Sequence, residues 1–239
     1  MPQLPLTVKT FTDYPQQLAL LKQRGMIIDD EARCLRKLQQ VSYYRLSGYY
    51  YVARQFHPTE YHTIGSHSVR KRLDSFEPKT HFSAVFDLYI FDKKLRLLLL
   101  DALERIEIAI RSAIIHEIGR LDALGHITGS VINPKQVSTF QSWQQKADEK
   151  LNRARKEDYI SWHLNQNKPI PIWVAGETWD FGALSKLVKL LNRSIVNTAC
   201  KRLNLPPNLL PDWLEPLNHL RNRCAHHSRT WNYCANNPL

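Results

Sequence analysis

Glycine and strand-like alternation are both scarce in this sequence. Only 8 of its 239 residues are glycine. No segment shows the clear two-residue alternation that marks a strand with one buried face, which excludes a hairpin-rich β fold. Apolar residues instead recur with the helical period through nearly the whole chain. The sequence therefore predicts an all-α fold.

Cysteine is also sparse, and the pairs that would indicate a redox or metal site are missing. The four cysteines, at positions 34, 200, 224 and 234, include no C-x-x-C pair. The opening residues, MPQLPLTVKTFTDYP, have no apolar core of the kind that a signal peptide needs. Four thiols in a chain without such a signal are typical of a reduced, cytoplasmic protein.

Long apolar runs without charge are lacking as well. The most apolar stretch, LRLLLLDALERIEIAIRSAII at residues 95–115, carries a charge every few residues and is too polar for a membrane span. There is no H-E-x-x-H, no Walker loop and no G-x-S-x-G, so the chemistries that those motifs serve are not indicated. We predict no membrane association and no cofactor.

Acidic residues are outnumbered by basic ones. The chain has 22 Asp and Glu against 33 Lys and Arg, a formal net charge of +11. Such an excess favours a polyanionic partner, because each phosphate contact releases a counterion. A basic surface that serves only solubility is the alternative.

Three regions can be distinguished along the chain. Residues 1–56 are predicted to form helices packed on the core, with Asp29 or Asp30 capping one of them. Residues 57–80 hold two prolines and mixed polar side chains, which favours a linker or a small irregular insert, with short strands as an open alternative. Residues 81–239 have the periodicity of a helical bundle.

A long helix from about Ser83 to Gly119 is expected at the centre of that bundle, because apolar residues fill two of its faces. Glu107 and Arg111 stand four residues apart on it and can form an ion pair. Such a pair could belong to a structural ion network or to the polar wall of an active cleft. Arg111 is therefore a candidate substrate-binding residue.

The stretch LRNRCAHHSRTWN, residues 220–232, concentrates nitrogen-rich side chains at the end of the last predicted helix. That helix is expected to bury the stripe Trp213, Leu217, Leu220 and Cys224. Asn222 and His226 share a face, while Arg221 lies about 140° from His226. A helix end or a second copy of the chain would bring Arg221 and His226 together.

These residue types suit metal-free cleavage of RNA. An imidazole can deprotonate the ribose 2′-hydroxyl, which then attacks the adjacent phosphorus. A guanidinium grips phosphate oxygens in pairs and stabilises the charge of the phosphorane. Asn222 could orient a neighbour or hold a phosphate oxygen. From the pattern alone, a solvated basic helix end is the competing interpretation.

Zinc and single-strand stacking are two further interpretations of nearby residues. Four ligand-type side chains occur near the motif, but their spacing fits no common zinc site, so we predict no metal; they are Cys224, His226, His227 and Cys234. A zinc-stabilised DNA-binding protein remains a third possible class. In SYYRLSGYYYVAR, residues 42–54, tyrosines beside Arg45 could stack bases or simply pack in the core, and Arg45 is a candidate phosphate contact.

Four segments together resemble the abortive-infection (Abi) proteins of bacteria, the AbiD/AbiF-like branch, which carry a HEPN domain. The segments are LLKQRGMIIDDEARCLRKLQQVSYYRLSGYY, FDKKLRLLLLDALERIEIAIRSAI, PIWVAGETWDFGALSKL and LRNRCAHHSRTWN. The HEPN signature is an Arg, a polar residue that is often Asn, three further residues and a His. Arg221, Asn222 and His226 match it and are the catalytic residues that the resemblance implies.

The resemblance implies an all-α, HEPN-like helical bundle with an N-terminal helical extension. It further implies a homodimer with a composite active site and a metal-independent endoribonuclease that acts in phage defence or as a toxin. RNA is then the expected partner, and an RNA or protein antitoxin would restrain the activity. His227, Arg229 and Trp231 are candidate substrate contacts, although Trp231 could equally pack in the core. A module that binds RNA or protein without cleavage is the alternative.

Overall fold

The computed structural model describes residues 8–233, and these residues are mainly helical. Within them lies a single two-stranded antiparallel sheet, which corrects the prediction of a purely α fold. The chain divides into two compact units, the first ending at Lys94 and the second beginning at Leu95. Each unit is described separately below.

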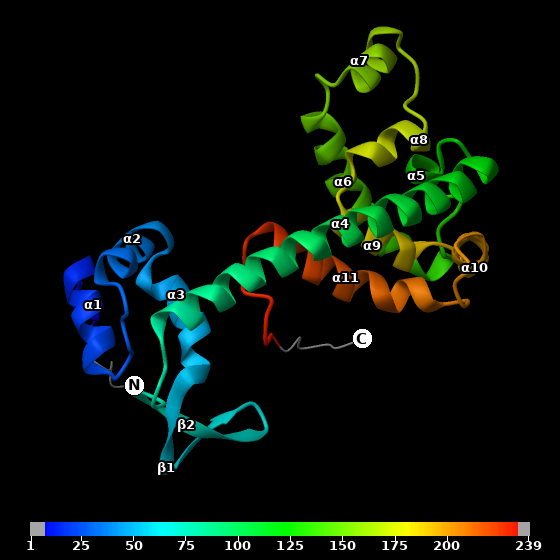
Figure 1. Cartoon of the computed structure of the whole chain (residues 1–239). Coiled ribbons are helices and arrows are strands. Elements are labelled where there is room, and N and C mark those ends of the chain that lie inside the picture. The colour runs from blue at the N-terminus through cyan, green and yellow to red at the C-terminus, as the bar shows by residue number, and fades with distance from the viewer. Residues whose placement is uncertain (1–7, 234–239) are drawn as a thin grey trace, which may run out of the picture. The chain divides into compact units, whose positions relative to one another are not determined.

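The first unit contains three helices, a short 3₁₀ turn and a β-hairpin (Figure 1). Its elements are α1 (Tyr14–Gln23), α2 (Glu31–Val41), α3 (Tyr43–Tyr50), η1 (Tyr51–Ala53), β1 (Arg54–Ile64) and β2 (His67–Phe76). The start of α4 (Phe82–Leu121) completes it.

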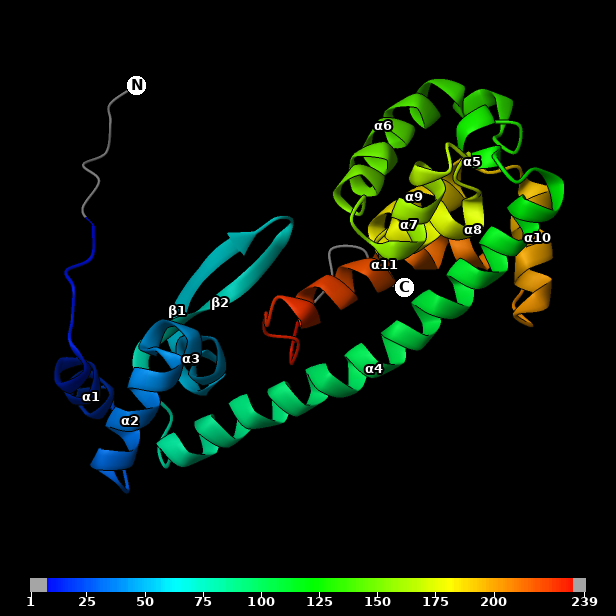
Figure 2. The ribbon, with the colours of Figure 1, turned by 90° about the horizontal axis from the view of Figure 1, so that it is seen from above.

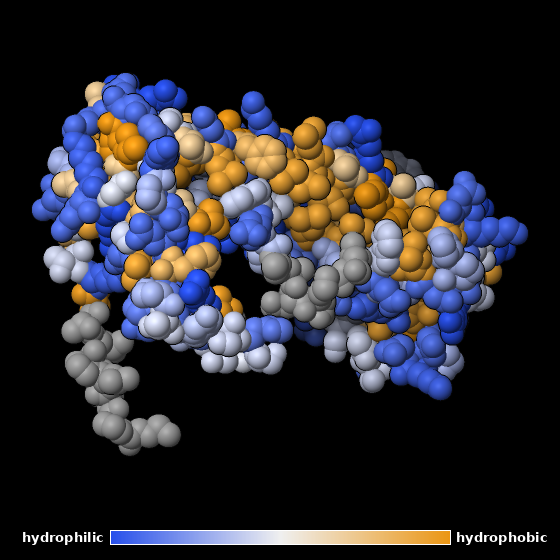
Figure 3. Space-filling model, turned by 60° about the horizontal axis from the view of Figure 1, so that its bottom comes forward, coloured by the Kyte–Doolittle hydropathy of each residue, from blue (hydrophilic) through white to orange (hydrophobic). Residues whose placement is uncertain are grey.

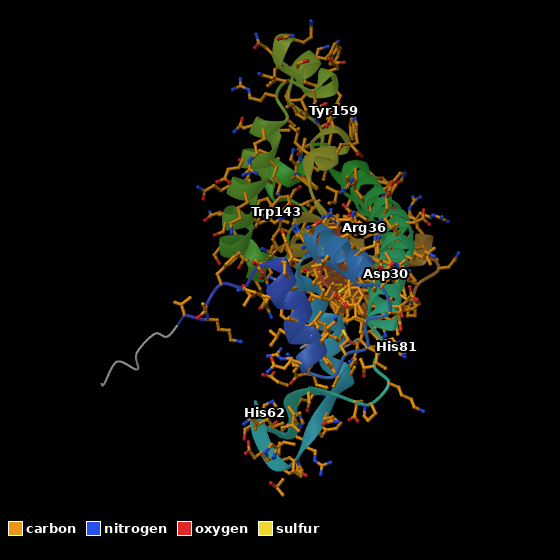
Figure 4. The ribbon with its side chains drawn as sticks, turned by 60° about the vertical axis from the view of Figure 1, so that its left-hand side comes forward. Asp30, Arg36, His62, His81, Trp143 and Tyr159 are labelled. Carbon is orange, nitrogen blue, oxygen red and sulfur yellow. The ribbon has the colours of Figure 1, made fainter. Side chains whose placement is uncertain are left out.

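Local sequence signals set the helix boundaries of this unit. Asp30 caps α2, since its carboxylate accepts a hydrogen bond of 2.8 Å from the backbone N–H of Arg33; Figure 4 labels this residue. The turn after α1 uses Gly25 at a φ of +91°, a conformation that costs glycine little. The predicted cap at Asp29 or Asp30 is thus confirmed for Asp30.

The tyrosines of residues 42–54 divide between core and surface. Tyr49 and Tyr50 are buried, and the Tyr49 hydroxyl donates a 2.6 Å hydrogen bond to Asp92. Tyr44 and Tyr51 are exposed. The aromatic ring of Tyr51 lies beneath the guanidinium of Arg54, 5.7 Å from its centroid. Core packing therefore accounts for part of the cluster only.

The segment predicted as a linker or irregular insert forms most of the β-hairpin. In its register Arg54 pairs with Phe76 and Phe56 with Arg72, with an irregularity after Phe56 where Pro58 interrupts the ladder. Only Phe76 is buried in β2. Because both faces of the hairpin meet solvent, its sequence carries no apolar alternation, and short strands were only an alternative in the sequence prediction.

Helix α4 was predicted nearly to its true ends. Its buried side chains in the second unit are concentrated toward its carboxyl end, where Ile114 and Ile118 are fully buried. Ile106 and Ile108 are exposed by 37% and 54%. The expectation that apolar residues are covered on two faces is therefore met only in part.

The second unit is a helical bundle built around α9 (Phe181–Leu190). In it α9 packs against α6 (Val137–Arg153) and α11 (Leu209–Ala225), as Figure 2 shows. The remaining elements are α5 (Gly125–Thr128), η2 (Pro134–Gln136), α7 (Asp158–Asn165), α8 (Ile172–Ala175), η3 (Gly176–Thr178) and α10 (Arg193–Arg202).

The core of this unit centres on α9. Phe181, Leu184 and Leu187 are fully buried, and burial of each such side chain contributes about 2 kcal/mol. Gly176 lets η3 approach α4, because a Cβ atom there would lie 2.1 Å from Cδ1 of Ile115. Close packing of this kind fixes α4, α9 and α11 against one another, and these are the elements that carry the candidate site.

Candidate functional site

The predicted motif lies at the carboxyl end of α11. This helix is anchored in the core by Leu210 and Leu214, and Cys224 is buried in its last turn. The predicted stripe was one residue out of phase near its start, since Trp213 is 43% exposed and Leu214 takes the buried position. Cys224 was placed correctly.

A left-handed residue ends α11 directly after the motif. His226 is the C-cap, and His227 follows with a φ of +56°. The N–H of His227 donates to the carbonyl of Cys224 and that of Ser228 to the carbonyl of Arg223, at 3.1 and 2.9 Å, which is the hydrogen-bond pattern of a Schellman motif. Histidine thus occupies a position that usually belongs to glycine, so no glycine marks this helix end.

Arg221 is held in place by two neighbours. One guanidinium nitrogen donates to Oδ1 of Asn222 at 3.1 Å and another to Oε2 of Glu107 at 3.3 Å. Glu107 lies 114 positions away in the sequence, on α4. The first two residues of the motif are therefore in direct contact, and α4 supplies the counter-charge.

Glu107 joins Arg221 to a second arginine. Its other carboxylate oxygen accepts a 2.6 Å bond from Arg111, which confirms the predicted pair. Arg111 also donates to the backbone carbonyl of Trp179 at 2.8 Å. The side chain of Glu107 is only 11% exposed, so a buried carboxylate lies between two guanidinium groups.

The amide of Asn222 links the motif to α9. Its nitrogen lies 3.5 Å from Oδ1 of Asn218, a long hydrogen bond one turn back on α11. Asn218 in turn lies against Gly182, where a Cβ atom would come within 3.5 Å of its amide nitrogen. The polar network of Arg221 thus extends to the first turn of α9.

Asp180 caps α9 beside this network. Its carboxylate accepts a 2.8 Å bond from the N–H of Ala183 and pairs with Lys150 of α6. Burial alone would raise the pKa of Asp180, but Lys150, the Ala183 N–H and the charge of Arg221 together hold it below its usual range. The carboxylate therefore stays ionised, and Arg221 acts on it electrostatically.

The two histidines of the motif are exposed to solvent. His226 donates its backbone N–H to the carbonyl of Asn222 at 2.9 Å, which fixes its backbone at the helix end. Its imidazole does not point into packed apolar side chains. An accessible imidazole can accept and release protons near neutral pH.

The chain after His226 folds back along α11. The Arg223 guanidinium donates to the carbonyl of Arg229 and lies 3.4 Å above the ring centroid of Tyr233. Nε2 of His219 lies 3.0 Å from the Tyr233 hydroxyl, and the two rings stack. Arg229 and Trp231 are half-buried in this returning segment.

The contacts of Tyr233 with His219 and Arg223 were not predicted, although the sequence contained one usable signal. His219 and Arg223 are four residues apart and share a face of α11, so a ring could have been expected to lie across both. What the sequence could not supply was the identity of that ring. Tyr233 lies ten residues beyond Arg223, past a helix end that no glycine marks.

The remaining candidate residues, Arg111 and Arg45, belong to different units. Arg111 lines a hollow of about 890 Å³ on α4, with His116, Arg120 and Trp173 among its other walls. Arg45 is exposed on α3 of the first unit.

Neither a metal cluster nor a membrane-spanning helix occurs between residues 8 and 233. No three His, Cys, Asp or Glu side chains in that range come together as metal ligands. Cys234, one of the four ligands considered above, lies outside the described residues. None of the helices in the same range combines the length and apolar character that crossing a bilayer requires.

Comparison with known families gives one match. The model of a family described as Abi-like protein matches residues 36–232, an interval that includes α4, α9 and the whole motif. No curated protein matches the chain. No solved structure matches it either.

Proposed function

This chain belongs to the Abi-like protein family, and on that premise we propose that it is a metal-independent endoribonuclease of the HEPN type. The family name refers to abortive infection, a form of phage defence. The protein acts in such defence or as a toxin in the cytoplasm, where an RNA or protein antitoxin restrains it. The observation that carries the proposal is the contact between Arg221 and Asn222 one turn before an accessible His226.

In the proposed reaction His226 removes the proton from a ribose 2′-hydroxyl. The 2′-oxygen then attacks the neighbouring phosphorus, and Arg221 stabilises the added negative charge of the phosphorane. The bond from phosphorus to the 5′-oxygen breaks, and an imidazolium protonates the leaving oxygen. Asn222 orients Arg221 through the 3.1 Å hydrogen bond. The products are a 2′,3′-cyclic phosphate and a 5′-hydroxyl.

Two copies of the chain form the site in this scheme. One imidazole must act as base and another as acid, and a homodimer supplies both. An apolar surface on α4 supports such association, since Leu97, Leu98 and Ile108 are exposed by 58%, 71% and 54%. Figure 3 shows apolar side chains reaching the surface between hydrophilic ones. His227, Arg229 and Trp231 contact the flanking nucleotides in this proposal.

The test is cleavage of RNA in the presence of EDTA. We expect cleavage to persist and to leave 2′,3′-cyclic phosphate and 5′-hydroxyl ends. Arg221→Ala and His226→Ala should each lower the rate by at least about 10²-fold while thermal unfolding shows a folded protein. Arg105→Ala and His67→Ala are matched controls, since both residues are exposed and lie outside the motif.

Two results would contradict the proposal. Cleavage that stops in EDTA would rule out the metal-free scheme. Cleavage undiminished in both motif variants would remove the site assignment.

A non-cleaving module that binds RNA or protein is the second candidate function. It is favoured by the ion pair between Arg221 and Glu107, because a guanidinium already paired with a carboxylate offers less charge to a phosphorane. Such a module would shift RNA in a salt-dependent way and leave it intact.

A further inference from the structure

A basic groove of about 740 Å³ lies between α6 and α9 in the second unit. Two lysines from each helix line it, Lys146 and Lys150 from α6 and Lys186 and Lys189 from α9. The lysines of each helix are three or four residues apart and therefore share a face. Figure 4 labels Trp143, which belongs to α6.

Part of the groove's lining is made of small residues. Gly182, Ala183 and Ala147 line it. Nε1 of Trp143 donates a 2.9 Å bond to the carbonyl of Ala183, which holds α6 and α9 together beneath the opening. A site with long cationic side chains from both of its helices suits an extended anion rather than a compact one.

Two of the four lysines remain available to a ligand. Lys150 is paired with Asp180, and Lys189 with Glu215. Lys146 and Lys186 are exposed and form no ion pair with any residue from 8 to 233. Direct ion pairs therefore involve only two of the four lysines, while Lys186 acts on Glu215 through its charge alone.

Part of the groove's lining lies close to the motif. Gly182 and Asp180 are among the lining residues, Asn218 packs against Gly182, and the charge of Arg221 acts on Asp180. The amides of Asn218 and Asn222 connect this region to Arg221. A strand lying in the groove therefore has a short way to the guanidinium that the proposed reaction uses.

The other hollow near Arg221 lacks this character. It is lined by Arg111 and Arg120, but Arg111 pairs with Glu107 and Arg120 with Glu117. Glu177 adds a negative charge to its wall. Both arginines of this hollow already form ion pairs, so it is the weaker site for phosphate.

We propose that the groove between α6 and α9 binds the phosphate backbone of the RNA strand on one side of the cleavage position. Lys146 and Lys186 contact successive phosphates, and the strand continues to Arg221. This inference rests on the proposed function, because RNA is taken from it as the polyanion. The contacts are to the backbone, so they contribute affinity and register rather than base preference.

The test measures binding of a labelled single-stranded 2′-O-methyl oligoribonucleotide, which has no free 2′-hydroxyl and cannot be cleaved. Fluorescence anisotropy over a range of salt concentrations compares the wild-type protein with the double variant Lys146→Gln/Lys186→Gln. We expect binding about tenfold weaker at physiological salt and a salt slope smaller in magnitude by about 1.4, since each single-strand phosphate contact contributes about 0.7.

A matched control separates the groove from net charge. Lys156→Gln/Lys201→Gln removes the same charge from two exposed positions outside the groove and should bind as the wild type does. Lys146→Arg/Lys186→Arg keeps both charges and should also bind as the wild type does. Equal binding by the two glutamine doubles would overturn the proposal. So would competition by ATP as effective as that by unlabelled oligonucleotide, because the groove would then hold a free nucleotide.

Cleavage assays distinguish failure of this inference from failure of the proposed function. If the protein cleaves RNA and the groove double has an unchanged KM, the groove assignment is wrong and the function stands. If the groove double loses oligonucleotide binding but the wild-type protein cleaves no RNA, the groove stands and the nuclease does not. With both correct, the groove double raises KM more than it lowers kcat.

Discussion

Glu107 holds two arginines that would otherwise repel each other. Arg221 and Arg111 both reach its carboxylate, at 3.3 and 2.6 Å, and their side chains are 29% and 15% exposed. Removing one partner of a fully buried ion pair costs about 3–5 kcal/mol. Solvent reaches these arginines, so the cost here is smaller.

We predict that Glu107→Gln lowers the free energy of unfolding by about 2 kcal/mol, because two guanidinium groups are left without their counter-charge. Urea denaturation provides the measurement. Glu104→Gln, an exposed glutamate on the same helix, serves as the control and should change stability little. Equal stability of the two variants would show that the network contributes nothing to folding.

At the residue scale, contacts between residues close in the sequence could be predicted, and contacts between distant residues could not. The contact between Glu107 and Arg111 follows from their spacing of four residues on a helix. The contact between Glu107 and Arg221 spans 114 positions, and no pattern within either segment specifies it. The motif lies at the end of the last helix, as predicted, while its counter-charge and the lysine groove became visible only when the helices were placed in space.

Among the elements, those with strong local signals were predicted and those without were not. The long period of α4 and the aspartate before α2 were sufficient to place both helices. The hairpin lacked alternation because solvent covers both of its faces. The end of α11 was predicted within residues 220–232 although no glycine marks it, since His227 takes the left-handed position. Prediction failed for the hairpin, where solvent on both faces removes the apolar pattern.

The short helix α5 buries an ionisable group that should make stability depend on pH. His126 packs against Trp179, with ring centroids 6.1 Å apart, and its Nδ1 has no hydrogen-bond partner among the described residues. Burial lowers the pKa of His126 from 6.5 to about 4, although the charge of Asp122 opposes the shift. Between pH 6.5 and about 4, His126 therefore binds a proton in the unfolded chain but not in the folded chain.

We therefore predict that the free energy of unfolding decreases as the pH falls through the window between 6.5 and 4. The loss from this residue amounts to at most about 3 kcal/mol. Urea denaturation of the wild-type protein and of His126→Gln at both ends of the window measures it. The variant should lack this part of the pH dependence, whatever its stability at neutral pH. Parallel pH profiles would contradict the prediction.

On the scale of the whole molecule, the proposed composite site makes a prediction that a site within one chain does not. Arg221→Ala and His226→Ala are each inactive in this scheme. A dimer of one wild-type and one His226→Ala subunit has only one of the two imidazoles that the reaction needs, so a single variant subunit inactivates the dimer.

Mixing equal amounts of wild-type and His226→Ala protein under conditions that allow subunit exchange should give about a quarter of the activity of the same total amount of wild-type protein, because only a quarter of the dimers then have two intact subunits. RNA cleavage by the mixture, compared with that of wild-type protein alone, is the measurement. About half of the activity despite demonstrated exchange would place a complete site within one subunit.

Pro216 lies inside α11, between the turns that enter the core and the turns that carry the motif. Its ring nitrogen has no hydrogen to donate, so one rung of the helix ladder is missing there. Bending at that point costs less than elsewhere along the helix. The direction of the last turns is therefore set by the contacts of their side chains with Glu107 and with Tyr233. A ligand that drew Arg221 away from the Glu107 carboxylate would therefore need to displace only the last turns of α11 and not the whole helix.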